Sequence, residues 1–225
     1  VIDIAKNRAQ EVASAIQSKN GNALAIKTEV TSEDSVNYAT QQAINHFGRL
    51  DFLVHCAGNN IKSSILDLSK EDWESVLNTH LTGAFLFSKA VGKQLVMQHE
   101  GGRVVFMSSV AATAPVPERG AYTPSKAGLI GLAGVLSLEW AQHNINVNSI
   151  CPGVIVSPMV EMVYKRDPEL REQRLKRMPS GREGYPEEIA DLVIFLCSDK
   201  ATHINGAAIP VDGSFLNNPF MVTHN

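Results

Sequence analysis

A tyrosine and a lysine four residues apart, with a serine upstream, are the side chains in this sequence best placed to do chemistry. Tyr122 and Lys126 stand at the start of a predicted helix, and their spacing puts both on one face of it. Ser109 ends the strand predicted before that helix, at the edge where open parallel sheets bind their ligands. All three side chains are therefore expected at a ligand site.

Together these groups could move a proton to or from an oxygen atom. A phenol has a pKa of about 10, and a neighbouring ammonium lowers it because it favours the phenolate. A serine hydroxyl could hold a carbonyl oxygen as negative charge develops on it. The set could thus give a proton to a ketone or take one from an alcohol. A Tyr-x-x-x-Lys pair alone is weak evidence, since most such pairs are solvated helix faces.

Alternating strands and helices must position these side chains. Apolar runs predict strands at residues 1–3, 23–27, 51–55, 104–107, 145–150 and 207–211. The helices predicted between them include one with an apolar stripe at Ala9, Val12, Ala13 and Ile16, one from Thr31 or Ser32 to Phe47, one long helix from Ser69 through Phe85, one from about Pro124 to Gln142, and one over 186–198. This alternation is typical of a single α/β domain over residues 1–225, with a doubly wound, mostly parallel sheet.

The pattern changes between the last two predicted strands. Residues 158–182 are rich in charge, and Pro168 and Pro179 interrupt them. The stretch is too short for a second domain. We expect a helical lid within the one domain, forming much of the substrate pocket.

Composition excludes several classes of protein. The 225 residues carry 20 basic and 23 acidic side chains, a net charge of −3, so nothing favours nucleic acid or an anionic membrane as a partner. No apolar run is long enough to span a bilayer, and no leader precedes the domain in this sequence. The three cysteines are an odd number without metal-ligand spacing, which favours a reduced, cytoplasmic compartment and no metal.

Several motifs carry a family resemblance. Ser109 precedes Tyr122-Thr123-Pro124-Ser125-Lys126 by thirteen residues, and further matching segments are Leu53–Gly58, Cys151–Met159, Gly184–Ala190 and Val211–Gly213. Spanning nearly the whole chain, they resemble the short-chain dehydrogenase/reductase family. The resemblance implies a Rossmann-type fold that binds NAD or NADP, a secondary alcohol or ketone as substrate, and a homotetramer. In its terms Tyr122 is the general acid/base, Lys126 lowers the pKa of Tyr122 and binds the nicotinamide ribose, and Ser109 orients the substrate oxygen.

The resemblance also implies residues before Val1. The family's first strand and glycine-rich turn would precede this sequence, as about 25–30 residues, the size of a strand, a turn and a helix. That strand would lie in the middle of the sheet, and the turn would hold the cofactor's pyrophosphate.

Two acidic positions are expected near the adenosine. Asp3 matches the acid that hydrogen-bonds the ribose hydroxyls and repels a 2′-phosphate, so NAD is expected over NADP. Alternatively, Asp3 is a surface residue that caps a helix. Glu29-Val30 matches a pair beside adenine, with Val30 acting through its backbone, or Glu29 is an exposed flanking acid.

Two turns complete the expected cofactor site. The turn after residue 55 contributes Cys56, Ala57 and Gly58, where Ala57 and Gly58 allow close approach of a ribose and Cys56 replaces an amide. We expect Cys56 to be a packed thiol rather than a reactive one. The second turn contributes Pro152, Gly153, Ile155 and Ser157, with the Ile155 N–H and the Ser157 hydroxyl expected at the nicotinamide carboxamide.

His80 stands where the family has a fourth catalytic residue, an asparagine. That asparagine holds a water beside the lysine. A neutral imidazole has one donor and one acceptor, so His80 could keep that role. Alternatively, His80 is a packed substitute and the proton relay is altered.

Two other functions remain open. A non-catalytic dinucleotide-binding partner or sensor on the same scaffold would suit the changes at His80 and Cys56. A methyltransferase on a related sheet would leave Tyr122 and Lys126 without a task.

Overall fold

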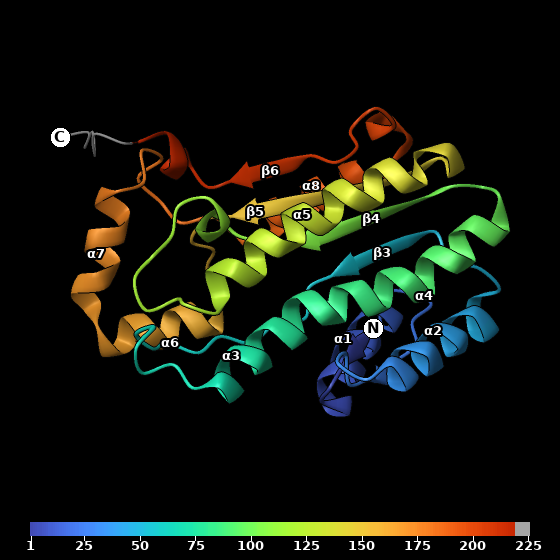
Figure 1. The fold of residues 1–225 in the computed structure, drawn as a ribbon, viewed down its shortest axis with the longest axis horizontal. Coiled ribbons are helices and arrows are strands. Elements are labelled where there is room, and N and C mark those ends of the chain that lie inside the picture. The colour runs from blue at the N-terminus through green and yellow to red at the C-terminus, as the bar shows by residue number, and fades with distance from the viewer. Residues whose placement is uncertain (219–225) are drawn as a thin grey trace.

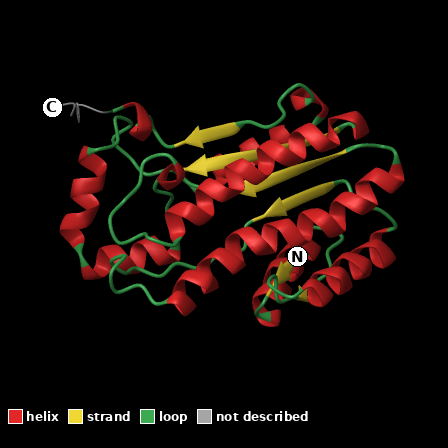
Figure 2. Ribbon diagram, viewed as in Figure 1, coloured by secondary structure: helices red, strands yellow, loops and turns green. Residues whose placement is uncertain are grey.

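The computed structural model describes residues 1–218, so the last seven residues of the expected domain, 219–225, lie outside the described part. The strands are β1 (Ile2–Asp3), β2 (Ile26–Lys27), β3 (Phe52–His55), β4 (Gly102–Met107), β5 (Ile145–Pro152) and β6 (Ala208–Val211). The α-helices are α1 (Lys6–Gln17), α2 (Glu33–Phe47), α3 (Lys70–Leu77), α4 (Gly83–Gln98), α5 (Tyr122–Trp140), α6 (Pro158–Arg166), α7 (Pro168–Lys176) and α8 (Pro186–Leu196). Strands and helices alternate along the chain as predicted (Figures 1 and 2).

All strand pairs are parallel, and they form two sheets. Strands β3, β4, β5 and β6 lie side by side in that order, while β1 pairs only with β2. Among the described residues, β1 and β3 each have one edge without a strand partner. The additional strand expected before Val1 stays a prediction.

Helices pack on both faces of the larger sheet, as a doubly wound fold requires. Along β4, Val104 and Phe106 face the core formed with α4 and α5, whereas Val105 faces the core formed with α8. Successive strand residues point to opposite faces, so a strand buried on both sides is apolar throughout. The predicted α/β, Rossmann-type fold class is confirmed.

Local signals at helix ends were read correctly. The Ser32 hydroxyl accepts the Ser35 N–H at the start of α2, and Gly48 ends that helix with φ of 80°. The Ser69 hydroxyl accepts the Asp72 N–H at the start of α3. Short polar side chains satisfy the free N–H groups of a first turn, and glycine takes the left-handed conformation after the last.

Two helices differ in detail from what the sequence indicated. The long helix expected from Ser69 through Phe85 is interrupted by a π-helical turn at Asn78–Thr82, with His80 at its centre. A π-helical turn holds one more residue than an α-helical turn and is therefore wider. Such turns are frequent at functional sites. The apolar stripe of α1 is only half buried, since Ala9 and Ala13 are buried while Val12 and Ile16 are exposed.

The charged stretch between β5 and α8 forms two helices, α6 and α7, which project from one end of the sheet (Figure 1). The expected helical excursion is therefore present. Its function as a substrate lid stays a prediction.

Candidate active site

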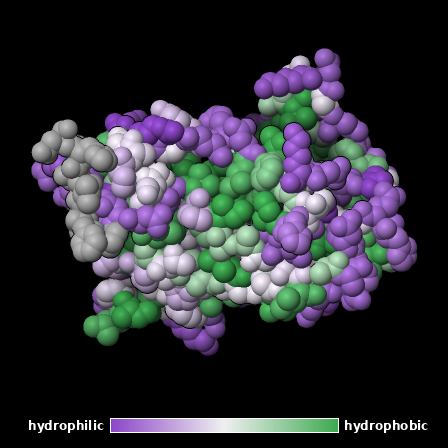
Figure 3. All heavy atoms as spheres, turned by 90° about the horizontal axis from the view of Figure 1, so that it is seen from above, coloured by the Kyte–Doolittle hydropathy of each residue, from purple (hydrophilic) through white to green (hydrophobic). Residues whose placement is uncertain are grey.

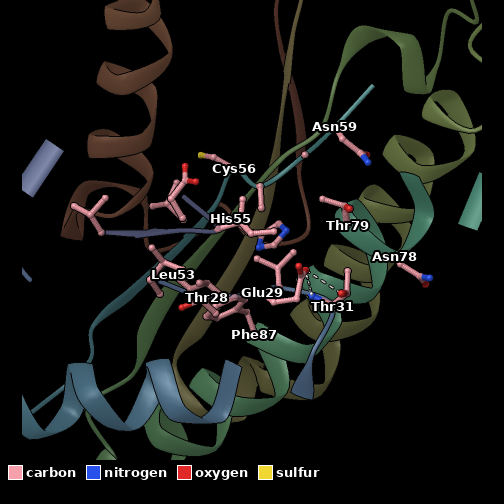
Figure 4. Close-up of a pocket in the computed structure, with 18 of the residues that line it drawn as sticks. Thr28, Glu29, Thr31, Leu53, His55, Cys56, Asn59, Asn78, Thr79 and Phe87 are labelled. Atoms are coloured by element: carbon pink, nitrogen blue, oxygen red, sulfur yellow. Dashed lines mark hydrogen bonds between the residues drawn. The ribbon is translucent and has the colours of Figure 1, made fainter. Parts of the chain in front are cut away.

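A cavity of about 860 Å³ lies between the β1–β2 pair and β3. The predicted strand before Val1 would lie in this same gap, so the cavity's volume alone is not evidence of a ligand. Six of the expected cofactor residues line it, namely Asp3, Glu29, Val30, Cys56, Ala57 and Gly58. Figure 4 labels Glu29 and Cys56 among them. All six stand at or after the carboxyl end of a parallel strand, where ligands bind in open α/β sheets.

Both acidic residues at this cavity have local backbone partners. Asp3 Oδ1 accepts the Ala5 N–H at 2.7 Å just before α1, so Asp3 caps that helix while lining the cavity. Glu29 Oε1 accepts the backbone N–H and the hydroxyl of Thr31, at 3.2 and 2.9 Å (Figure 4). One oxygen of Asp3 therefore caps α1, as the alternative interpretation expected, and the residue also lines the cavity.

Three buried polar atoms beside this cavity have no hydrogen-bond partner within the described part of the chain. They are Nε2 of His55, the hydroxyl of Thr28 and Oδ1 of Asn59. All three residues line the cavity and are labelled in Figure 4. Buried polar atoms are nearly always paired, so these three need hydrogen-bond partners, which a polar ligand such as a dinucleotide or the predicted strand before Val1 could supply.

His55 is neutral at physiological pH. Burial lowers its pKa to about 4, and the charge of Lys126 adds to that effect. No role was predicted from the sequence for His55 or Thr28. A titratable residue at the end of a buried strand was the available signal for His55.

Cys56 opens onto the cavity and is exposed there, although protein surrounds it on its other sides. That desolvation raises the pKa of the Cys56 thiol, and the charge of Lys126 opposes it. A raised pKa leaves little thiolate, which agrees with an unreactive thiol. We expected Cys56 to be a packed thiol, and this was wrong because its side chain is exposed.

Lys126 links the first turns of α5 to the end of β4. Its Nζ donates to the Met107 carbonyl at 2.8 Å, and its own carbonyl accepts the Ser108 hydroxyl at 2.8 Å. Nζ also lies 5.5 Å from the centre of the Tyr122 ring. Burial lowers the pKa of Lys126 to about 8, so the side chain is mainly an ammonium at neutral pH.

Ser109 follows β4 directly and opens a short 3-10 turn at Val110–Ala112, where its hydroxyl accepts the Ala111 N–H at 3.1 Å. Within the described residues, no hydrogen bond joins Ser109 to Tyr122. The structure nevertheless places Ser109, Tyr122 and Lys126 at one end of the sheet, because β4 and α5 are tied there.

The turn after β5 lies apart from the cavity at β1 and β3. Gly153 packs closely on Asp212, where a Cβ would lie 2.9 Å from the Asp212 Cα. Ile155 pairs with Gly184, and the Ser157 hydroxyl accepts the Val160 N–H at the start of α6. Pro152 ends β5. Of the expected cofactor residues, these four, Tyr122 and Lys126 do not line the cavity.

His80 is buried and engaged through both ring nitrogens. Its Nε2 lies 2.9 Å from the Asn59 N–H nitrogen and 2.8 Å from the Asn59 carbonyl, and its Nδ1 lies 3.0 Å from the Ser125 hydroxyl. A neutral ring that accepts from Asn59 and donates to Ser125 lets Ser125 donate in turn to the Tyr122 carbonyl at 2.7 Å. The ring also stands edge-on to Tyr122, with centroids 5.5 Å apart.

These contacts favour the packed-substitute interpretation of His80. Burial lowers its pKa to about 4, which keeps the ring neutral. A Cβ on Gly58 would lie 2.7 Å from His80 Nε2, so glycine is needed for the close approach. Sequence reasoning missed Ser125 as the partner of His80, since only the fold brings them together.

Residues 1–218 contain neither a metal-binding cluster nor a membrane-spanning helix. No three His, Cys, Asp or Glu side chains are grouped as a metal site would need. None of the helices there has the length and apolar character to cross a bilayer.

Comparisons with known proteins match nearly the whole chain. The family model for enoyl-(acyl carrier protein) reductase matches residues 1–215. The D-threitol dehydrogenase of Mycolicibacterium smegmatis is 36% identical over 215 residues, which cover 95% of this chain and 81% of that protein. The 2-dehydro-3-deoxy-D-gluconate 5-dehydrogenase of Escherichia coli is 31% identical over 193 residues, covering 86% and 76%. An NAD+-bound xylitol dehydrogenase superposes with a TM-score of 0.90 at 29% identity, covering 94% of this chain and 86% of that one.

Proposed function

This chain belongs to the short-chain dehydrogenase/reductase family, and from that premise we propose that it interconverts a secondary alcohol and a ketone with NAD as cofactor. It is an oxidoreductase of the hydride-transfer type. The observation that carries the proposal is the joining of β4 to α5 through Lys126, which places Ser109, Tyr122 and Lys126 at the carboxyl end of the sheet.

Each of the three side chains has one task in the proposed reaction. The Tyr122 hydroxyl gives a proton to the ketone oxygen, or takes one from the alcohol. Ser109 donates a hydrogen bond to that same oxygen and so holds it in place. The nicotinamide ring, when bound, supplies or accepts the hydride.

Lys126 supports Tyr122 electrostatically. Its ammonium lies 5.5 Å from the Tyr122 ring centre, within a buried environment where charges interact more strongly than in water. With a pKa of about 8, Lys126 keeps that charge at neutral pH.

A preference for NAD over NADP rests on Asp3. The carboxylate lines the cavity at the end of β1, and one of its oxygens caps α1. A negative charge there would repel a 2′-phosphate on the adenosine ribose. Arg8 lines the same cavity and would offset part of this repulsion.

We further propose a cytoplasmic homotetramer. Exposed apolar side chains on α5 and α8, among them Leu138 at 81% and Ile194 at 68%, offer surface for subunit contacts. Figure 3 shows apolar residues gathered across the middle of the side where these helices and β6 lie. All three cysteines are free, which suits a reduced compartment.

A non-catalytic dinucleotide-binding sensor is the second candidate. The observation in its favour is His80, whose ring nitrogens are both engaged by Asn59 and Ser125. A water relay through this position would then be missing.

The test is an absorbance assay that follows NADH and NADPH formation with polyols and simple secondary alcohols, and NADH and NADPH consumption with ketones. Turnover that depends on NAD, with weaker turnover on NADP, supports the proposal. Dinucleotide binding without turnover of any substrate would contradict it and favour the sensor. The names of the relatives span neutral polyols and a gluconate, so the panel includes charged and uncharged compounds.

A further inference from the structure

An arginine without an acidic partner stands beside the proposed catalytic tyrosine. The Arg119 guanidinium carbon lies 5.9 Å from the centre of the Tyr122 ring. Its backbone is fixed on both sides, because Arg119 forms a parallel bridge with Ser63 and its carbonyl accepts the Thr123 N–H at 3.0 Å. The chain therefore presents this guanidinium at the first turn of α5.

No carboxylate within residues 1–218 forms an ion pair with Arg119. Its neighbour Glu118 is engaged by Lys62, at 2.8 Å. Arg119 is itself half-buried. Burial lowers the pKa of Arg119, the charge of Arg174 acts in the same direction, and Tyr122 and Glu118 oppose them.

Arg174 comes from α7 in the predicted lid. It is half-buried, and its Nη1 lies 3.4 Å from the Tyr164 hydroxyl, a neutral partner. Oε2 of the nearby Glu183 carboxylate accepts a hydrogen bond from Arg171 Nη2 at 3.1 Å, and Oε1 has no hydrogen-bond partner within the described residues. Arg171 therefore has an acidic partner, whereas Arg174 forms no ion pair among residues 1–218.

Arg119 and Arg174 interact electrostatically, and two half-buried positive charges that do so repel because water screens them poorly. An anion between them would relieve the repulsion. The planar guanidinium forms paired, charge-assisted hydrogen bonds with carboxylate and phosphate oxygens, which makes arginine well suited to such groups.

We propose that Arg119 and Arg174 bind an anionic oxygen group of the substrate, a carboxylate or a phosphate, so that the enzyme acts on negatively charged hydroxy or oxo compounds. This inference rests on the proposed function, since it places the substrate beside Tyr122. One arginine comes from the loop before α5 and the other from the lid, so substrate charge would also hold α7 against the reacting end of the sheet (Figure 1).

The test compares ketones that differ only in charge. The pairs are 4-oxopentanoate and 5-oxohexanoate against their methyl esters, and hydroxyacetone phosphate against hydroxyacetone, each with NADH. The first two pairs report a carboxylate site and the third a phosphate site. The variants are Arg119→Gln, Arg174→Gln and Arg119→Lys. Arg166→Gln, an exposed arginine on α6, is the matched control.

The wild-type protein should have a higher kcat/KM for at least one charged ketone than for its neutral partner. Because hydrogen bonds to charged groups are the strong ones, Arg119→Gln and Arg174→Gln should each raise KM for the charged ketone by roughly 10- to 100-fold. KM for the neutral partner should stay unchanged, Arg119→Lys should recover part of the loss, and Arg166→Gln should behave as wild type. Equal kcat/KM within all three pairs, or equal losses for both members of a pair, would overturn the inference.

A binding measurement separates this inference from the proposed function. Calorimetry of the three charged ketones is run with the NADH-bound Tyr122→Phe protein, with and without Arg119→Gln. Binding that needs Arg119 supports the anion site even if no ketone is turned over. Absence of binding, or binding unaffected by Arg119→Gln, contradicts the anion site even if Tyr122 proves catalytic.

Discussion

Two buried histidines should make this protein lose stability in mild acid. His55 is 4% exposed and His80 is 1% exposed. Desolvation lowers the pKa of each to about 4 in the folded state. In the unfolded chain both rings regain a pKa of about 6.5. Between these two values, the unfolded chain binds more protons than the folded one.

The sign and size of the effect follow from that difference. Protons favour the state that binds more of them, so the free energy of unfolding falls as pH falls from about 6.5 towards 4. At pH 5, each histidine should have removed about 2 kcal/mol relative to neutral pH. The two rings repel each other when charged, so about 4 kcal/mol is the upper limit for the pair. The pKa of Glu188 is lowered to about 2, so its contribution is lost below this window.

The assay is urea unfolding at pH 7, 6 and 5. We expect wild type to lose about 2–4 kcal/mol across this range, and His80→Asn to lose about half as much because one titrating ring is gone. His203→Asn, which alters an exposed histidine, is the matched control and should follow wild type. A wild-type stability that stays level from pH 7 to pH 5, or an unchanged slope in His80→Asn, would refute the burial argument.

Three further outcomes are expected. Asp3→Ala should weaken NAD binding more than NADP binding by calorimetry, and equal losses would remove the basis for NAD preference. Gly58→Ala places a Cβ 2.7 Å from His80 Nε2 and should lower the free energy of unfolding in urea by about 1–3 kcal/mol. Gly131→Ala is the control, because open space surrounds Gly131, and it should not lower that free energy. Similar losses in the two variants would contradict the close packing at Gly58. Burial lowers the pKa of Lys126 to about 8, so its ammonium is lost above that pH and dinucleotide affinity should fall between pH 7 and 9. Lys126→Met should show no such fall in affinity. A fall that persists in this variant would exclude Lys126 as its source.

Most of the fold could be predicted from the spacing of residues that are close in the sequence. Ser32, Gly48 and Ser69 act within one helical turn, so their types and positions predict the helix ends they form. Strand alternation and apolar runs likewise predict the layers. The exposure of Val12 and Ile16 was not predictable, because it depends on what packs against α1 and not on α1 itself.

The residues of the candidate site also differ in whether local sequence could predict them. The motif residues Ser109, Tyr122 and Lys126 were found because they are close in sequence. The π-helical turn and the bonds from His80 to Asn59 and Ser125 join segments 21 and 45 residues apart, and no local pattern encodes them.

The unpaired Arg119 was equally invisible in the sequence. An arginine in a sequence can be recognised as unpaired only when the structure shows which acidic side chains form ion pairs with other residues. Glu118, for example, is paired with Lys62.

Replacement of the Tyr122 hydroxyl is the most direct measurement of the proposed chemistry. Tyr122→Phe keeps the ring and removes the one group that gives or takes the proton. We predict that kcat falls by roughly 100- to 10,000-fold, the usual contribution of general acid–base catalysis, while NADH affinity stays at the wild-type value. A Tyr122→Phe protein that turns over its substrate at the wild-type rate would contradict the assignment of Tyr122 as the proton donor and acceptor.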